Sequence, residues 1–242
     1  MVSRRLLILS ILVLISLASC KKTTETLKGT ITGRISACDA GWKVNDTLTG
    51  ARISLFKDLL PIASDTSIAG SFSVDNILYG RYNLTIEKDG YVPFSTVVEH
   101  IGGYSPTIVH PWLYEIPKFE ITLDSAAEVL GFYKEYELKI YSRISGNQPK
   151  PVLGYKFLCF FSNQPGTDAD HYSTVTTAVA FTDDVTGEHA NFLVMNDYAY
   201  YALRSDTIYA RLYPVPWSES EYSFHKQYFG KPSNVLASLL KP

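Results

Sequence analysis

The stretch AGSFSVDNILYGRYNLTIEKDGY, residues 69–91, decides the fold class of the chain. Residues 70–74 alternate apolar and polar side chains, and residues 82–86 repeat this alternation. A period of two is the signature of a β-strand with one buried face. Residues 75–80, between the two runs, are rich in turn-forming residues, and residues 88–90 supply a second tight turn. This pattern predicts an antiparallel β meander.

The composition favours an all-β protein of one or two domains. The chain has 242 residues, of which 46% are hydrophobic and 13% aromatic. Its 17 tyrosines and 12 phenylalanines, against 2 methionines, favour β structure, because aromatic side chains pack well on pleated surfaces. The net charge is −2, and no run of basic residues follows Lys21-Lys22. We therefore expect no nucleic acid partner.

The first 19 residues have the pattern of a signal peptide. Arg4 and Arg5 precede an apolar stretch that runs from Leu6 to Ala18. A membrane-spanning helix needs roughly 20 apolar residues, so this stretch is too short to span a bilayer. Its length suits the apolar region of an export signal. We predict that residues 1–19 are removed.

The junction Leu17-Ala18-Ser19-Cys20 resembles the lipobox of bacterial lipoproteins. The resemblance implies that Sγ of Cys20 carries a diacylglycerol, that the chain is cut before Cys20, and that the new amine is acylated, for example with palmitate. Residues 20–27 are then the lipidated cysteine and a polar tether. Several acyl chains hold a protein firmly at a bilayer. The alternative is an ordinary secretory signal with a coincidental cysteine.

The same resemblance implies a location in the Gram-negative cell envelope. We expect the outer membrane, reached through the lipid on Cys20. Surface-export signals tend to place acidic residues just after the cysteine, and here Glu25 is isolated. The periplasmic and surface faces therefore both stay open.

Residues 28–124 are predicted to form a first β-sandwich. Short alternating strands separated by Gly, Asn and Asp turns are typical of this architecture. Residues 100–117 show little periodicity and are expected to fold over this domain, whose boundary is placed at Asp124-Ser125. The expected strands are residues 29–36, 50–56, 70–74, 82–86, 97–98 and 118–123.

The glycine-marked segments of this region resemble the carboxypeptidase regulatory-like domain and its transthyretin-like relatives. Tyr79 stands where the family usually has a proline. In that family the module is a non-catalytic accessory domain, and some relatives bind starch, so the resemblance implies a scaffold or binding role. The matching segments are Gly29-Thr30-Ile31-Thr32-Gly33, Gly50-Ala51-Arg52-Ile53, Gly70-Ser71-Phe72, Gly80-Arg81-Tyr82-Asn83-Leu84 and Gly90-Tyr91.

Residues 125–242 are predicted to form a second β-sandwich. Residues 152–161 are almost continuously apolar, which indicates a central strand buried on both faces. Leu203 and Tyr209 have the spacing of the tyrosine corner, so this region resembles a fibronectin type III-like domain. No amphipathic helix of convincing length follows the signal. The expected strands are residues 133–141, 152–161, 174–181, 190–195, 203–213 and 233–239.

Few residues suggest chemistry. Cys38 and Cys159 could pair in an oxidising compartment, but two inert, half-buried thiols are the preferred interpretation. Asp168 and Asp170, like the pair Asp183-Asp184, could offer oxygens to calcium, although solvated turns are the simpler explanation. No zinc, phosphate-loop or nucleophile-elbow motif occurs. We expect no cofactor, no metal and no enzymatic activity; a site formed only by folded geometry stays an alternative.

Aromatic residues are the most informative feature of the second half. A loop at residues 213–229 is polar and contains Pro and Ser, yet beyond Tyr213 it carries five aromatic rings. Exposed rings there could stack on sugars or anchor a protein; the preferred interpretation is that they fold inward as a small core. Trp112 and Tyr114 are weighed in the same way, and Trp42, in the loop before the second expected strand, ranks below them. The candidate ligand-binding residues are Trp217, Tyr222, Tyr228 and Trp112.

The function that these patterns predict is a membrane-anchored envelope lipoprotein that acts as a non-catalytic binding or structural module. As a glycan-binding protein, it would use Trp217 with Tyr222 or Tyr228 as a stacking platform. As an assembly component, it would bind an envelope protein through an aromatic patch. A polysaccharide and an envelope protein are thus the two expected classes of partner besides the membrane.

Overall fold

The computed structural model describes residues 27–130, 136–146, 150–181, 185–186, 189–194 and 207–239. Within these ranges the chain is all-β, as predicted, with one short 3-10 helix, η2 (Lys226–Tyr228). No helix in the described part is long and apolar enough to cross a bilayer. Cys20, Leu203 and Asp183-Asp184 lie outside the described residues, so the predictions on them stay predictions.

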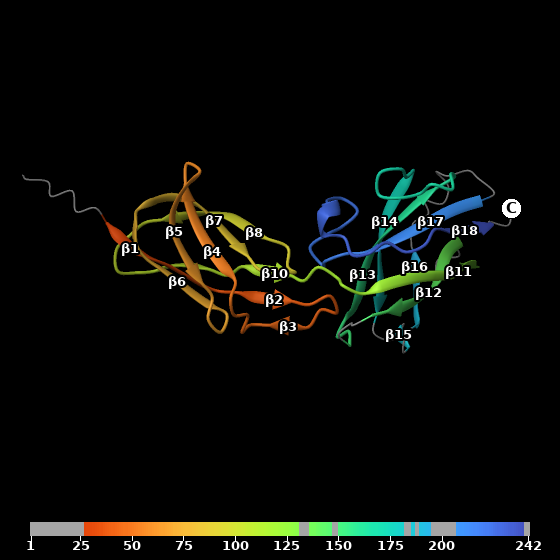
Figure 1. Ribbon diagram of the computed structural model, residues 1–242, viewed down its shortest axis with the longest axis horizontal. Helices are drawn as coiled ribbons and strands as arrows, with labels where there is room; N and C mark the ends of the chain where they lie inside the picture. The colour runs from red at the N-terminus through yellow and green to blue at the C-terminus, as the bar shows by residue number, and fades with distance from the viewer. Residues whose placement is uncertain are drawn as a thin grey trace, which may run out of the picture.

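The sheets form two groups along the long axis of the molecule (Figure 1). Strands β1 to β10 make the first group, and strands β11 to β18 make the second. Each group encloses its own cluster of buried apolar side chains. The described chain therefore has two main cores.

One sheet of the first group has three strands in the order β6-β1-β9. β1 (Lys28–Arg34) pairs antiparallel with β6 (Ser71–Leu78) and parallel with β9 (Thr107–Val109). A separate short sheet, in the order β10-β2-β3, follows β1 after Ile35. It is described with the functional site below.

The facing sheet has four antiparallel strands in the order β5-β4-β7-β8. They are β4 (Arg52–Lys57), β5 (Leu60–Thr66), β7 (Gly80–Glu87) and β8 (Phe94–His100). Inward side chains of both sheets form the first core and are almost fully buried. They include Ile31, Phe72, Val74, Ile53, Leu55, Leu84 and Ile86.

The predicted pairing of the meander at residues 69–91 is wrong. β6 continues through the predicted turn to Leu78 and pairs with β1, whereas β7 begins at Gly80 and pairs with β4 and β8. The chain thus crosses from one sheet to the facing sheet at Tyr79. The apolar faces of the two strands bury each other across the core instead of lying side by side. The second predicted turn is confirmed, because the Tyr91 N–H donates to the Lys88 carbonyl at 3.0 Å.

One sheet of the second group has the order β11-β12-β16-β15. β11 (Glu120–Leu130) pairs along its length with β12 (Tyr136–Ser145), which pairs in turn with β16 (His189–Val194). The two-residue strand β15 (Val185–Thr186) lies at the edge.

The facing sheet has the order β14-β13-β17-β18. Its strands are β13 (Gly154–Ser162), β14 (Thr174–Phe181), β17 (Thr207–Pro214) and β18 (Leu236–Leu239). β13 is buried on both faces, which confirms the prediction from Gly154 onward, whereas Val152 and Leu153 are exposed and precede the strand. Its residues Tyr155, Phe157, Cys159 and Phe161 face the second core.

The predicted last strand of the first domain, residues 118–123, belongs to the second group instead. Its residues from Glu120 onward are part of β11, and Phe119, Ile121 and Leu123 lie in the second core. The expected boundary at Asp124-Ser125 falls inside this strand, at a register shift between Leu123 and Ser125. Alternation predicts a strand, but it does not say which core the strand joins.

Candidate functional site

The candidate site begins with a short hairpin of the first group. β2 (Ser36–Cys38) pairs with β3 (Val44–Asn45) and, in parallel, with β10 (Trp112–Tyr114). β9 and β10 arise from residues 100–117, where no strand was predicted. A strand of three residues is too short to show a period of two in the sequence.

Residues 39–43 form the tight loop of this hairpin. Oδ1 of Asp39 accepts the backbone N–H groups of Gly41 at 2.9 Å and Lys43 at 2.8 Å. The Trp42 N–H donates to the Asp39 carbonyl at 3.1 Å, and Trp42 has a left-handed backbone with φ of 68°. Such a conformation costs a non-glycine residue roughly 1–2 kcal/mol and is often found at functional positions. Asp39 therefore fixes the backbone of the loop that carries Trp42.

The same loop docks on the second group. The Gly41 carbonyl accepts the Val152 N–H at 2.8 Å, and Nε1 of Trp217 donates to the Ala40 carbonyl at 3.1 Å. The Ala40 side chain is 4% exposed and belongs to the second core. Residues 39–43 thus join the two groups of sheets.

Four aromatic side chains follow one another across this junction, and we call them the aromatic row. The ring centroids of Trp112 and Tyr114 lie 6.4 Å apart, those of Tyr114 and Trp42 lie 6.5 Å apart, and those of Trp42 and Trp217 lie 4.8 Å apart in a T-shaped contact. Trp112 and Tyr114 share a face of β10 because Leu113 between them is buried in the first core. Trp112 is 40% exposed, and the other three rings are half-buried.

Polar groups accompany both ends of the aromatic row. Ser36, the register partner of Trp112, donates its hydroxyl to Oδ1 of Asp46 at 2.7 Å. At the other end, Nζ of Lys156 donates to the Trp217 carbonyl at 3.1 Å and lies 6.0 Å from the ring centroid of Trp217. Burial lowers the pKa of Lys156. The row therefore combines apolar rings with a hydroxyl, a carboxylate and an amine.

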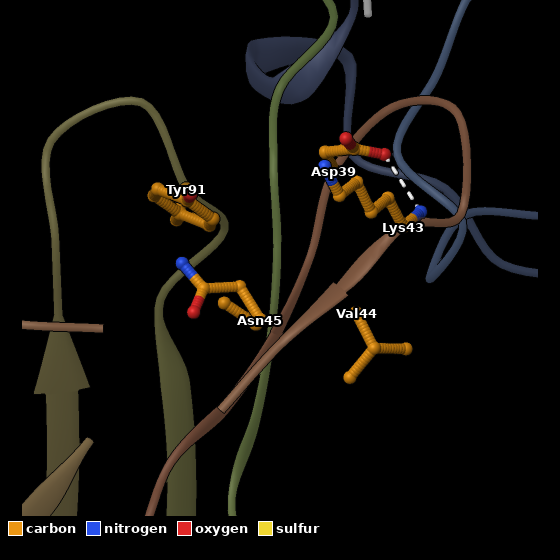
Figure 2. A pocket seen from close by; sticks show the side chains of 6 residues that line it. Asp39, Lys43, Val44, Asn45 and Tyr91 are labelled. Carbon is orange, nitrogen blue, oxygen red and sulfur yellow. Dashed lines mark hydrogen bonds between the residues drawn. The ribbon is translucent and has the colours of Figure 1, made fainter. Parts of the chain in front are cut away.

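A pocket of about 450 Å³ lies beside the loop that carries Trp42 (Figure 2). Figure 2 shows the Asn45 and Tyr91 side chains lying across from each other. Burial raises the pKa of Tyr91, and the Glu115 carboxylate adds to the shift. The lining residues are Ala37, Asp39, Lys43, Val44, Asn45 and Tyr91.

A second pocket, of about 580 Å³, has walls from both groups of sheets. The first group contributes Arg52 and Glu87, which form an ion pair, together with residues 88–91 and Pro93. The second group contributes Tyr228 from η2. Its wall is thus mostly polar, and Tyr91 lines this pocket as well as the first.

The structure brings some of the predicted site residues together and separates others. Trp112 and Trp217 lie in the aromatic row, while Tyr228 lines the second pocket. Tyr222 is 91% exposed and has no ring contact among the described residues. The rings that link the row, Trp42 and Tyr114, were weighed from the sequence but left out of the candidate set. No local pattern places them next to Trp217.

The phenylalanines of the loop at residues 213–229 fold inward, which confirms the preferred interpretation for them. The Phe160 ring on the outer face of β13 contacts Phe224 at 5.7 Å and Phe229 at 6.2 Å between centroids. Leu158, Tyr213 and Val215 complete this small third cluster. The loop therefore covers the outer face of β13, which explains why that strand is buried on both sides.

The two cysteines are separate thiols, as the sequence favours, and Asp168 closes the acidic loop. Cys38 and Cys159 are unpaired and buried, and burial raises the pKa of Cys38 to about 12. Oδ1 of Asp168 accepts the N–H groups of Asp170 at 2.8 Å and His171 at 2.7 Å, and these bonds lower the pKa of Asp168. Among the described residues, no three His, Cys, Asp or Glu side chains gather to hold a metal ion.

No family model and no curated protein matches the chain. Among solved structures, it is similar to a DUF3823 family protein from Parabacteroides merdae, at 15% identity over 88% of this chain and 99% of that chain, with a TM-score of 0.32. A candidate carbohydrate binding protein from Bacteroides uniformis shows 11% identity over 87% and 98%, with a TM-score of 0.31. BcpA, the major pilin subunit of Bacillus cereus, shows 12% identity over 88% and 69%, with a TM-score of 0.38. Similarity at this level assigns no function to the chain.

Proposed function

We propose that this chain is a lipid-anchored, non-catalytic binding protein of the bacterial cell envelope, and that its ligand is carbohydrate. The observation that carries the proposal is the aromatic row Trp112-Tyr114-Trp42-Trp217, which continues from one group of sheets to the other. The resemblance of residues 29–91 to a non-catalytic accessory module also supports it.

Carbohydrate suits the chemistry of the aromatic row. A sugar ring has apolar C–H faces that pack on aromatic side chains, and hydroxyl groups that need donors and acceptors at its edges. The Ser36–Asp46 pair beside Trp112 and the Lys156 amine beside Trp217 supply such groups. Three of the rings are half-buried, so little side-chain freedom is lost when a ligand binds.

Binding without catalysis is supported by how the nearby acidic groups are used. Asp39 accepts two backbone N–H groups of its own loop, and Asp46 accepts the Ser36 hydroxyl. Catalysis would need titratable groups that converge on one reacting position. At the aromatic row, these two carboxylates instead hold the hairpin that carries Trp42.

The lipid anchor rests on the sequence Leu17-Ala18-Ser19-Cys20. In cells fed with labelled palmitate, we expect the protein to carry the label and to sediment with membranes. Cys20→Ser should prevent both labelling and cleavage, whereas globomycin should leave a labelled precursor that still carries residues 1–19. Unchanged labelling and cleavage in Cys20→Ser would contradict the anchor.

The first prediction concerns the ligand and uses Trp112, the most exposed ring of the aromatic row. Detergent-solubilised mature protein should show saturable binding to at least one polysaccharide of a broad panel in affinity electrophoresis. Trp112→Ala should weaken that binding about tenfold, because an aromatic stacking contact contributes roughly 1.5 kcal/mol. Tyr222→Ala is the matched control, since Tyr222 is exposed but lies outside the row.

Two substitutions at Asp39 test whether this residue positions Trp42 in the aromatic row. Asp39→Ala removes the acceptor that positions Trp42, whereas Asp39→Asn keeps an oxygen at the same place. We expect weaker polysaccharide binding in Asp39→Ala and recovery in Asp39→Asn. Equal binding by Trp112→Ala, Tyr222→Ala and the unmodified protein, or no binding to any polysaccharide, would contradict a carbohydrate ligand at this row.

The second candidate function is a structural role with an envelope protein as partner. It is favoured by apolar side chains at the β4–β5 hairpin, where Leu59 is 87% exposed, Leu60 67% and Ile62 47%. β5 is also an edge strand, which another chain can pair with. Crosslinking in intact cells should then recover one stoichiometric partner, and Leu60→Lys should lose it. Recovery that Leu60→Lys leaves unchanged would contradict this surface.

A further inference from the structure

The end of the first group where the described chain begins carries five exposed apolar side chains. They belong to three separate segments of the sequence. Leu27 is 51% exposed, Leu78 41%, Tyr79 60% and Ile101 74%, and Tyr104 is fully exposed. We call this set the apolar end.

Backbone hydrogen bonds hold the three segments of the apolar end together. The Tyr79 N–H donates to the Leu27 carbonyl at 2.9 Å, and the Gly103 N–H donates to the Lys28 carbonyl at 3.0 Å. Lys28 is also the register partner of Leu78 in the β1–β6 ladder. The three segments that carry the five exposed side chains are therefore neighbours at this end, although the sequence separates them.

The buried side chain of His100 connects the strands next to the apolar end. Nε2 of His100 lies 3.2 Å from the Ile77 carbonyl, which can only accept, so this nitrogen carries the proton. Nδ1 lies 2.7 Å from the Thr107 hydroxyl. His100 is 2% exposed and pairs with Gly80 at the start of β7. His100, the last residue of β8, thereby contacts both β6 and β9. These contacts hold the segments of the apolar end in place.

Single exposed apolar residues are common on protein surfaces, but contiguous ones usually mark a contact. Two of the five side chains are tyrosines, whose ring is apolar and whose hydroxyl is polar. Tyrosine and tryptophan are enriched where protein meets the boundary between lipid and water. This combination suits a bilayer surface better than a dry protein interface.

We infer that the apolar end rests on the surface of the bilayer that holds the lipid anchor. The inference depends on the lipid attachment at Cys20 proposed above. Only residues 21–26 separate Cys20 from Leu27, and a fully extended chain spans at most about 3.6 Å per residue. Leu27 therefore lies within about 25 Å of the acylated cysteine.

This placement orients the molecule. Figure 1 shows β1 beginning at the end of the long axis that lies opposite the second group of sheets. With the apolar end on the bilayer, the second group points away from the membrane. The aromatic row, at the junction of the two groups, is then held above the headgroups, where a polymeric ligand has access.

The second prediction tests this contact with the full mature lipoprotein in vesicles of phosphatidylethanolamine and phosphatidylglycerol. Tyr104→Cys carries a bimane label, and the vesicles contain a lipid with a nitroxide quencher near its headgroup. Cys38 and Cys159 are buried, so only the introduced thiol reacts. Tyr222→Cys, labelled in the same way, is the control in the second group. We expect at least threefold stronger quenching at position 104 than at position 222.

A double substitution makes the test specific to the apolar end. With the label at position 104, Tyr79→Ser combined with Ile101→Ser should lower the quenching, while circular dichroism confirms that the protein is folded. Equal quenching at positions 104 and 222, in protein that floats with the vesicles, would overturn the contact and leave the anchor intact. Failure of the unmodified protein to float with the vesicles would overturn the anchor, and the contact with it.

Discussion

At the scale of single residues, the chain spends its reactive side chains on packing and on loop geometry. The Cys38 thiol lies on the short strand β2 and is fully buried between neighbours. Asp39, the next residue, uses one carboxylate oxygen to close the loop that positions Trp42. Both residues belong to the hairpin that carries Trp42 of the aromatic row. The burial of the Cys38 thiol can be tested, because burial changes the pH at which the thiol ionises.

The third prediction is a loss of stability at alkaline pH that depends on Cys38. Burial raises the pKa of Cys38 from 9.0 to about 12, so the folded protein keeps a proton that the unfolded chain releases. The free energy of unfolding is therefore unaffected below about pH 9 and falls as the pH rises towards 12. Each pKa unit corresponds to about 1.4 kcal/mol.

Urea unfolding between about pH 8 and pH 11 checks this prediction. Cys38→Ala should lose less stability over this range than the unmodified protein. The Tyr155 hydroxyl, whose pKa burial also raises to about 12, contributes the same decline to both proteins. Parallel curves for the two proteins would show that Cys38 does not titrate as its burial requires.

At the scale of the elements, β13 organises the second group. Its inward side chains fill the second core, and its outward side chains Leu158 and Phe160 lie under the loop at residues 213–229. Antiparallel sheets commonly expose one face to water, but here the loop supplies a second hydrophobic layer. The aromatic residues of the loop are therefore divided between structure, as Phe224 and Phe229, and the junction, as Trp217.

The fourth prediction tests the hydrophobic layer outside β13. Phe160 is fully buried and contacts four aromatic rings, so Phe160→Ala should lower the free energy of unfolding by about 3–5 kcal/mol. Phe181→Ala, at an end of β14 and 53% exposed, is the matched control and should cost less than about 1 kcal/mol. Chemical unfolding followed by circular dichroism measures both, and similar losses would contradict a packed outer layer.

At the scale of the whole molecule, the loop at residues 39–43 couples the two groups of sheets. It belongs to the first group through β2 and β3, yet Ala40 is part of the second core. The Gly41 carbonyl and the indole of Trp217 close the contact with hydrogen bonds. Because the aromatic row crosses the same junction, its geometry depends on this coupling.

The fifth prediction is that Gly41→Ala uncouples the two groups. A Cβ at Gly41 would lie 2.8 Å from Cα of Pro151, so the backbone must shift and the bond to Val152 weakens. Scanning calorimetry should show one transition for the unmodified protein and two, or one broadened at its low-temperature side, for the variant. Gly166→Ala is the control, because a Cβ there meets nothing within 4 Å. A single unchanged transition in Gly41→Ala would mean that the junction contributes no coupling.

Much of the strand content was predictable from single segments. The strand expected at residues 174–181 is β14 residue for residue, and the apolar run at residues 152–161 predicted a strand buried on both faces, which the structure has at Gly154–Ser162. The short strands β9 and β10 were missed, since three residues do not establish a period. Of the candidate site, the sequence pointed to Trp112 and Trp217 as separate residues.

The sequence was enough to show that this chain is built from β-strands, since alternation is a property of neighbouring residues. Long-range packing placed β6 opposite β7, put residues 119–123 in the second core, and brought Trp42 between Tyr114 and Trp217. These outcomes depend on contacts between segments far apart in the chain. Periodicity carries no information about which apolar face packs against which.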